Sequence, residues 1–156
     1  AMAGPNAINP APADAHQLVE DVVELLRPTL AHRGIALSSS VPALPHAALD
    51  IDRMKQVLLN LINNAADELK DGGEIRVSAE IHDEGGLDIH VDDSGPGFQA
   101  TGDTASKPLG LGLGLKISGE IVAAHGGDLL VSESPVLGGA RFTLSLPASI
   151  MSAPTP

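Results

Sequence analysis

The clearest chemical signal in this 156-residue sequence is a pair of asparagines one helical turn apart, Asn60 and Asn64. Residues at i and i+4 project from the same face of a helix, here just beside an apolar stripe. An amide carbonyl oxygen suits Mg²⁺, which keeps several waters and takes other oxygens from phosphates. We interpret the pair as the border of a cation-binding cleft; a solvated pair of amides on a helix edge is the alternative.

A second signal is the segment Asp93-Ser94-Gly95-Pro96-Gly97, which follows a run of alternating apolar residues. Glycines on both sides of a proline let the backbone turn sharply and approach a ligand closely. A carboxylate at the end of a strand can accept a hydrogen bond from an exocyclic amino group such as that of adenine. The segment therefore predicts a base-binding corner, with an ordinary turn at the exit of a hairpin as the alternative.

The third signal is the run from Gly110 through Gly112 and Gly114 to Leu115, which leads into a predicted helix. Alternating glycines expose N–H groups where the helix dipole is positive, and this arrangement favours phosphate. The run is not a P-loop, because no Gly-Lys-Ser/Thr follows, and its spacing differs from the dinucleotide pattern. Together and in this order, the three segments predict a cation ligand, a base reader and an anion cradle.

Composition narrows the classes of protein that fit. The formal net charge is −11, which argues against nucleic-acid binding and means that local groups must attract a polyphosphate. There is no cysteine, so disulfides and thiolate metal sites are excluded. No apolar run approaches the roughly 20 residues that span a bilayer. We expect a cytoplasmic domain without direct membrane contact, and leave open whether its parent protein carries a membrane anchor.

Periodicity predicts an α+β fold. Helical spacing indicates helices near 14–32, 51–69 and 113–125, and alternation indicates strands near 35–41, 74–81, 87–93, 128–132 and 140–147. Asp14 and Gln17 fit a capping box, Leu25 belongs to the first apolar stripe, and Pro28 should kink or end that helix. The order favours a two-layer α/β sandwich, a mixed sheet of about five strands with three helices on one face.

The chain ends look different from the rest. Residues 1–12 are rich in Ala, Pro and Asn, and predict a disordered arm whose first residues could come from an expression vector. Residues 149–156 predict a flexible tail, which leaves 13–148 as one folded domain.

At this point the sequence resembles the histidine-kinase branch of the Bergerat-fold ATPases. The stretch DIDRMKQVLLNLINNAADEL (50–69) resembles that family's N box, DDSGPGF (92–98) its first glycine box, and GLGLGLKISGEIVAAHGG (110–127) its second glycine box with the following helix. The resemblance covers about residues 14–147. It implies the catalytic ATP-binding domain of a bacterial sensor histidine kinase, cut away from its phosphoacceptor module.

The resemblance also implies roles for single residues. Asn64 would coordinate Mg²⁺, and Asn60 would line the same pocket of the Mg-ATP site. Asp93 would bind adenine, while Gly95 and Gly97 would shape the base pocket. The second glycine box would hold the phosphates; Lys107 would reach a phosphate or stay a solvated loop lysine. Gyrase-like hydrolases carry a glutamate where this sequence has Asn60, and an amide cannot act as a base near neutral pH.

The sequence departs from the family in two ways. Only twelve residues, 98–109, separate the glycine boxes, which is short for the lid of this family, and we expect that loop to be mobile. None of the six histidines fits the acceptor motif of a His followed by an acid and then a basic residue and Pro. His90 shares a strand face with Asp88 and Asp92, and we expect that face to be solvated.

The resemblance therefore implies a monomeric enzyme part that donates the γ-phosphoryl of Mg-ATP to a His on an upstream dimerisation module of the same parent. A response regulator would receive the phosphoryl group through the parent protein. Two alternatives stay open. One is a pseudokinase or nucleotide-dependent interaction module with an incomplete lid, and the other is a serine-kinase anti-sigma factor, which shares the fold.

Overall fold

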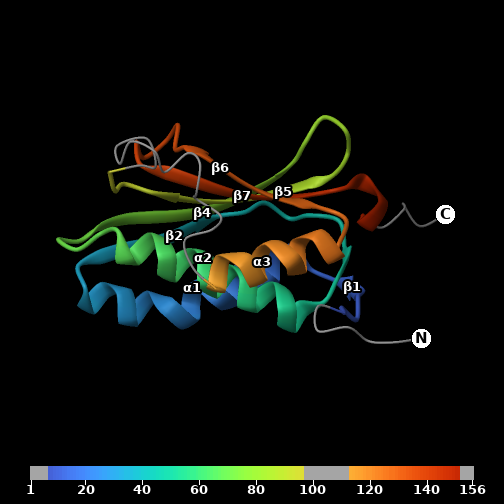
Figure 1. Ribbon diagram of the computed structural model, residues 1–156, viewed down its shortest axis with the longest axis horizontal. Coiled ribbons are helices and arrows are strands. Elements are labelled where there is room, and N and C mark those ends of the chain that lie inside the picture. Colours follow the sequence, from blue (N-terminus) through green and yellow to red (C-terminus); the bar gives the residue numbers. More distant parts are fainter. Residues whose placement is uncertain (1–6, 97–112, 152–156) are drawn as a thin grey trace.

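The computed structural model of the protein describes residues 7–96 and 113–151. In this part of the chain, three α-helices cover one face of a mixed five-stranded sheet (Figure 1), as the sequence predicts. The elements are β1 Ala11–Ala13, α1 Ala15–His32, β2 Ile35–Ser40, β3 Ala47–Leu49, α2 Ile51–Asp67, β4 Gly73–Ile81, β5 Leu87–Asp93, α3 Leu113–Ala124, β6 Asp128–Glu133, β7 Ala140–Leu146 and the short 3-10 helix η4 Ala148–Ile150. Among the helices described, none is both long and apolar enough to cross a membrane.

The large sheet has the strand order β2-β4-β5-β7-β6. β2 and β4 run parallel and the chain passes through α2 between them, whereas all other neighbours are antiparallel. β5 lies at the centre, where Asp93 stands opposite Ile75 of β4 and Asp92 opposite Arg141 of β7. This order explains why one end of β5 can meet both the turn after α2 and the β6–β7 connection.

Helix α1 has the predicted extent but differs from its prediction in two details. Asp14 caps it through the backbone N–H of Gln17, but the Gln17 side chain donates to Asp21 instead of completing a capping box. Pro28 lies inside the helix and does not end it, because the helix continues to His32 as predicted. Leu25 is 66 % exposed, because the buried side of α1 is carried by residues on either side of it, including Val22, Val23 and Leu30.

A second, two-stranded sheet was not predicted. β1 pairs antiparallel with β3, with Ala11 opposite Leu49 and Ala13 opposite Ala47. Ala47 also forms a bridge with Met151, just after η4. The structure thus differs from both predicted domain boundaries: the fold includes residues from 11 and reaches 151. Alanine and proline carry little strand signal, and the pairing joins segments more than thirty residues apart. Residues 1–6 and 152–156 lie outside the described part.

Helix α2 provides the middle of the core. Its seven predicted apolar positions are all buried: Met54, Val57, Leu58, Leu61, Ile62, Ala65 and Leu69. The side chain of Asp50 caps its first turn by accepting the backbone N–H of Arg53 at 3.2 Å. The same carboxylate accepts the backbone N–H of Asn9 at 2.8 Å, so the cap also ties down the N-terminal strand region.

The sheet face opposite the helices is not simply solvated, contrary to our expectation for His90 and its neighbours. Asp92 is 0 % exposed and accepts two hydrogen bonds from Arg141, at 2.7 and 3.1 Å. His90 is 7 % exposed and lies between Thr143 and Glu80. Long side chains on the neighbouring strands cover these groups, because cross-strand pairs stand only about 5 Å apart.

The Asp50 cap gives the first prediction. Asp50→Ala removes the acceptor for two backbone N–H groups and should lower the free energy of unfolding by about 1 kcal/mol, measured by urea denaturation. The Asn9 N–H, followed by weaker contributions from Arg53 and His125, lowers the pKa of the Asp50 carboxyl despite some desolvation. The stabilisation by the Asp50 carboxylate is therefore complete above the pKa that Asp50 has in the unfolded chain. It is lost as the pH falls through the lower pKa that Asp50 has in the folded protein.

The matched control for this prediction is Asp52→Ala, which removes an exposed carboxylate from the same first turn. It should change stability by no more than about 0.5 kcal/mol. Equal effects of the two substitutions would show that Asp50 acts by its charge near the helix terminus and not as a cap.

Candidate nucleotide-binding site

One face of α2 carries the site residues in a row. Asn60 and Asn64 are spaced by four residues, and the C-cap residue Glu68 continues the row by another four, over about 12 Å in all. Asn60 and Asn64 are half-buried, which places them at the border between the core stripe and the surface. The predicted common face of the two asparagines is therefore present.

The Asn60 end of this row contacts the start of α3. Its side-chain Nδ2 donates to the hydroxyl of Ser118 at 3.2 Å and points to the carbonyl oxygen of Gly114 at 3.4 Å. Ser118 is fully buried, so this amide fixes how the first turns of α3 sit on α2. A Cβ at Gly114 would come within 3.6 Å of the Asn60 amide, which is ordinary contact. The sequence did not indicate Ser118, although its place one turn after Gly114 could have done so.

The other end of the row lies at the end of β5. A Cβ on Gly95 would lie 3.3 Å from a methyl of Leu69 and 3.5 Å from Cβ of Glu68. The backbone after Asp93 therefore passes directly over the end of α2. Asn64 lies one helical turn from the contact with α3 and one turn from the contact with Gly95. α2 thus joins the predicted base-binding corner to the beginning of the predicted anion cradle.

Asp93 is a buried carboxylate at this corner, 2 % exposed as a residue. Alternation along β5 turns it to the helix side of the sheet, together with Ile89 and Val91. Its Oδ1 accepts the backbone N–H groups of Gly95 at 2.9 Å and Ala140 at 3.2 Å. Burial raises the pKa of the Asp93 carboxyl, and the nearby Asp92 adds to the rise, although the two N–H donors oppose it.

The β6–β7 connection forms the second wall around Asp93, and the sequence analysis missed it. The N–H of Gly139 donates to the carbonyl oxygen of Asp93 at 3.0 Å. A Cβ at Gly139 would stand only 2.3 Å from Asp93 Oδ1 and 2.6 Å from the Gly95 nitrogen, so only glycine fits. The signal was present as the pair Gly138-Gly139 between two predicted strands.

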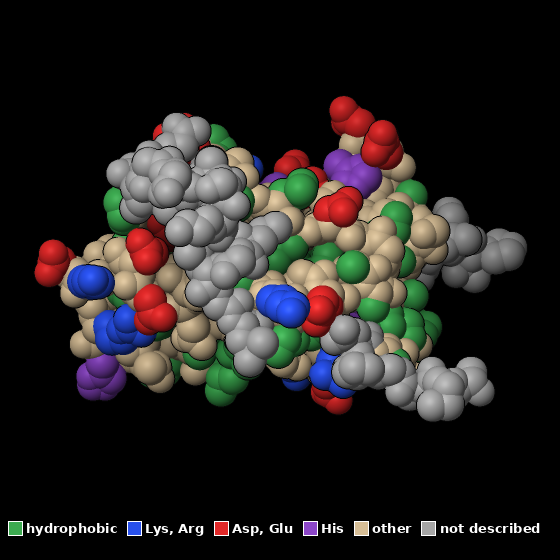
Figure 2. Space-filling model, in the orientation of Figure 1, with side chains coloured by type: hydrophobic (Ala, Val, Ile, Leu, Met, Phe, Trp, Pro, Cys, Tyr) green, Lys and Arg blue, Asp and Glu red, His purple; other side chains and the backbone are tan. Residues whose placement is uncertain are grey.

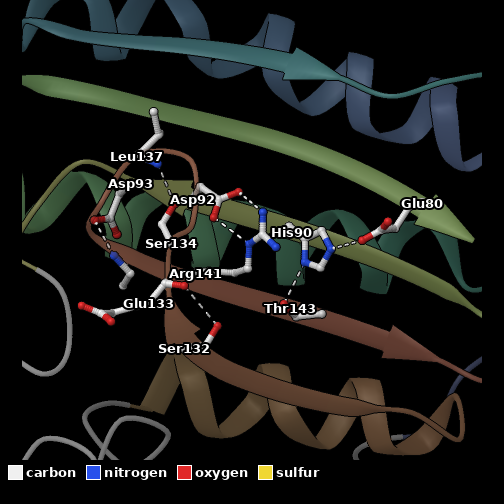
Figure 3. Close-up of polar contacts among 11 residues, drawn as sticks. Glu80, His90, Asp92, Asp93, Ser132, Glu133, Ser134, Leu137, Arg141 and Thr143 are labelled. Carbon is white, nitrogen blue, oxygen red and sulfur yellow. Dashed lines mark hydrogen bonds and ion pairs between the residues drawn. The ribbon is translucent and has the colours of Figure 1, made fainter. Parts of the chain in front are cut away.

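Further hydrogen bonds hold that connection in place (Figure 3). The Ser134 hydroxyl accepts the N–H of Leu137 at 3.0 Å, and Ser134 also exchanges main-chain bonds with Gly138 and Gly139. On the opposite sheet face, the Asp92–Arg141 pair fastens β5 to β7 at the same level. Breaking a buried pair of this kind commonly costs about 3–5 kcal/mol. Asp93 therefore sits in a wall that is braced from both sides.

The second glycine segment is described only in part. α3 begins at Leu113, so the backbone N–H groups of Gly114 and Leu115 fall in the first turn, where no intrahelical acceptor is available. The Leu115 side chain is 4 % exposed and packs in the core, which leaves its main-chain N–H as the group that could face an anion. Gly97, Lys107, Gly110, Gly112 and the predicted lid 98–109 lie outside the described residues.

The arrangement has a definite chemical capacity. It offers a buried acceptor for an amino group at one end, an amide oxygen of Asn64 in the middle, and at the other end the first-turn N–H groups of α3, which have no acceptor within the helix. An amine-bearing base, a cation and a phosphate chain match these groups in that order.

Comparison with known proteins identifies the family of the chain. Residues 49–150 match the family model described as histidine kinase-, DNA gyrase B-, and HSP90-like ATPase. The adaptive-response sensory kinase SasA of Prochlorococcus marinus is 32 % identical over 147 residues, covering 86 % of this chain and 39 % of that protein. The sensor histidine kinase ZraS of Klebsiella oxytoca is 35 % identical over 144 residues, covering 87 % and 31 %.

Among solved structures, full-length ShkA in complex with AMPPNP superposes with a TM-score of 0.80 and is 32 % identical; the match covers all of this chain and 34 % of that one. The chain thus spans well under half the length of these multidomain relatives. It belongs to the histidine kinase-, DNA gyrase B-, and HSP90-like ATPase family, as an ATP-binding domain of the sensor histidine kinase type.

Proposed function

We propose that this domain binds Mg-ATP and donates the γ-phosphoryl group to a histidine on a separate dimerisation module of the same parent protein. A response regulator would then take the phosphoryl group from that histidine. The observation that carries the proposal is the row on α2, which links the buried Asp93 corner to the first-turn N–H groups of α3.

Adenine fits the Asp93 corner for a chemical reason. Adenine carries an amino group where guanine carries a carbonyl oxygen, and a buried carboxylate is an acceptor only. Guanine would place two acceptors against each other out of water, which commonly costs about 1–3 kcal/mol or more. The N–H groups of Gly95 and Ala140 hold Oδ1 in place, so the carboxylate is oriented before the base arrives.

The phosphate side fits magnesium and a triphosphate. Asn64 would supply an oxygen ligand, and the N–H groups of Gly114 and Leu115 would face phosphate oxygens at the positive end of α3. Bound Mg²⁺ supplies charge neutralisation for phosphoryl transfer. The hydrogen bond from Asn60 to Ser118 holds α3 against α2, so these donors and Asn64 keep a fixed relative position.

Asn60 also bears on the type of reaction. It stands one turn before Asn64, where the hydrolytic relatives place a glutamate that activates water. Here the amide donates its N–H to Ser118 and cannot accept a proton near neutral pH. Slow hydrolysis and transfer to a supplied nucleophile follow from this chemistry.

Asp93 gives the first functional prediction. The protein should bind ATP and ADP, and GTP at least about tenfold more weakly, by calorimetry. Asp93→Asn and Asp93→Ala should each weaken ATP binding by roughly 10- to 100-fold. Burial raises the pKa of Asp93 above the ordinary aspartate value of 3.8. The ATP affinity of the unsubstituted domain should therefore begin to fall at a pH higher than the one at which an ordinary aspartate is protonated.

Stability measurements separate lost binding from misfolding. The folded state raises the pKa of Asp93, so its charged form disfavours folding above that pKa and the cost disappears as the pH falls. Without nucleotide, the Asp93→Asn variant should therefore be at least as stable at pH 7 as the unsubstituted domain. Asp128→Asn, an exposed carboxylate on β6, serves as the control for charge. If the unsubstituted domain binds ATP and GTP with equal affinity, the proposed role of Asp93 is wrong.

Asn64 gives the second functional prediction. Asn64→Ala should reduce the affinity for Mg-ATP by at least about tenfold, or 1.4 kcal/mol, while ADP binding without metal changes little. The control is Asn63→Ala, because Asn63 is exposed on the neighbouring side of the helix. If Asn64→Ala binds Mg-ATP as the parent does, Asn64 is only a helix-edge amide.

The transfer step is tested with γ-labelled ATP. Phosphoryl transfer depends on an in-line nucleophile, and none of the six histidines has the sequence pattern of an acceptor. The domain alone should release phosphate very slowly and incorporate no label. Adding the dimeric helical module with the acceptor histidine from the parent protein should produce acid-labile label on that module.

Three other outcomes of this experiment are informative. Stable label on the domain alone would reveal an acceptor within it, and fast phosphate release would indicate a hydrolase. Absence of label on the module, despite tight ATP binding, would favour the alternative of a nucleotide-binding pseudokinase.

A further inference from the structure

The outer face of the sheet, opposite the helices, carries a cluster of metal-binding side chains near the β4–β5 hairpin. Glu80 of β4 and Asp88 and His90 of β5 each offer one donor atom, and these atoms lie within 4.8 Å of one another. Register explains the cluster: Glu80 pairs with Asp88, and His90 follows two residues later on the same face. We call these three residues the outer-face triad.

Asp88 provides the observation that points to a ligand. Its Oδ1 atom is buried and, within the part of the chain that the structure describes, accepts no hydrogen bond. A buried carboxylate oxygen without a donor is costly, and such groups are rare in folded proteins. A proton or a cation at this point would remove that cost.

His82 does not supply the missing donor. Its Nε2 lies 3.9 Å from Asp88 Oδ1 and instead faces the carbonyl oxygen of Leu146 at 3.3 Å. The backbone N–H of Glu84 donates to His82 Nδ1, so a neutral ring carries its proton on Nε2. With the proton there and Nδ1 occupied, His82 is a hairpin-bracing side chain and not a metal ligand.

His90 has a different set of partners. Its Nδ1 lies 2.8 Å from the Thr143 hydroxyl, which accepts a hydrogen bond when Nδ1 carries the ring proton and donates one when it does not. Nε2 lies 2.9 Å from Glu80 Oε2 (Figure 3): with the ring proton on Nε2 it donates to that carboxylate, and with the proton on Nδ1 its lone pair points there and can bind a metal ion. A metal-binding histidine usually donates its other ring N–H to a carboxylate, a backbone carbonyl or a water, and the Thr143 hydroxyl would take that place here.

We propose that the outer-face triad binds one Zn²⁺ ion, with a water molecule completing the coordination. A site with an imidazole nitrogen and carboxylate oxygens favours Zn²⁺, whereas Mg²⁺ and Ca²⁺ prefer sites made of oxygen ligands alone. A tetrahedral zinc with bonds of about 2.0 Å separates its ligands by roughly 3.3 Å, so small side-chain rotations within the triad suffice. The two carboxylates neutralise the ion, and Glu80, whose side chain is 62 % exposed, leaves an open path to it.

This site is separate from the nucleotide site. Asp88 lies five residues before Asp93 on β5, roughly 17 Å along the strand, and on the other face of the sheet. The metal would join β4 to β5 near their hairpin, at the end remote from the base-binding corner. Zinc binding therefore requires no nucleotide, and its failure would leave the proposed kinase function untouched.

The test uses the whole 156-residue protein without nucleotide. Zn²⁺ affinity is measured by competition with a chromogenic chelator, and Co²⁺ replaces zinc to give a visible absorption band that reports coordination number. One equivalent should bind with a low-coordinate cobalt spectrum, and zinc should raise the thermal midpoint in proportion to the logarithm of its concentration. Asp88→Asn and His90→Gln should abolish this binding, and Thr143→Val should weaken it by about 10- to 100-fold.

His82→Gln is the matched control, since it removes a neighbouring histidine that the geometry excludes as a ligand and should keep zinc binding. Thermal unfolding midpoints measured in the presence of a chelator show whether each variant is folded. Without metal, Asp88→Asn should be no less stable than the unsubstituted protein, because it removes a carboxylate oxygen that lacks a hydrogen-bond donor. If Asp88→Asn or His90→Gln binds zinc with the affinity of the unsubstituted protein, the proposal is wrong. Loss of binding in His82→Gln, or a six-coordinate cobalt spectrum, would overturn it as well.

Discussion

The architecture depends on helix α2 having two faces with different tasks. Its apolar stripe, from Met54 to Ala66, is buried against the sheet and the other helices and fixes the helix in the core. The adjacent polar row can then meet α3 at one end and the end of β5 at the other. Burial of this apolar stripe is the main contribution of α2 to stability. Because the buried stripe fixes the position of the helix, it also fixes the distances between the candidate ligand groups, which do not contact one another.

Asp93 shows how the site departs from what stability alone favours. A carboxylate at a core-facing position of a central strand is disfavoured by desolvation, and the raised pKa of Asp93 reflects this. The fold limits the cost with two backbone N–H donors and with a glycine that allows close approach of the β6–β7 connection. Such a locally unfavourable residue, held in place by its surroundings, is the pattern expected of a binding site.

Strand β5 has an equally divided character. Its helix-facing side carries Ile89, Val91 and Asp93, whereas its outer side carries Asp88, His90 and Asp92. The space-filling view shows acidic and histidine side chains gathered near the β4–β5 hairpin (Figure 2), in keeping with the strongly negative net charge. Because side chains alternate along a strand, one short segment can contribute to two different ligand sites without bringing them together.

Local patterns in the sequence determined the elements. Period-3.6 and period-2 spacing predicted the helices and the strands of the large sheet, because one buried face leaves that signature in each element. The asparagine pair and the glycine segments likewise indicated ATP-binding chemistry. Tertiary structure alone decided the rest: the pairing of β1 with β3, the burial of His90 and Asp92, and the contact of Gly139 with Asp93. These depend on strand register and on contacts between distant segments, and a pattern read along the chain carries no information on which remote residue will stand opposite another.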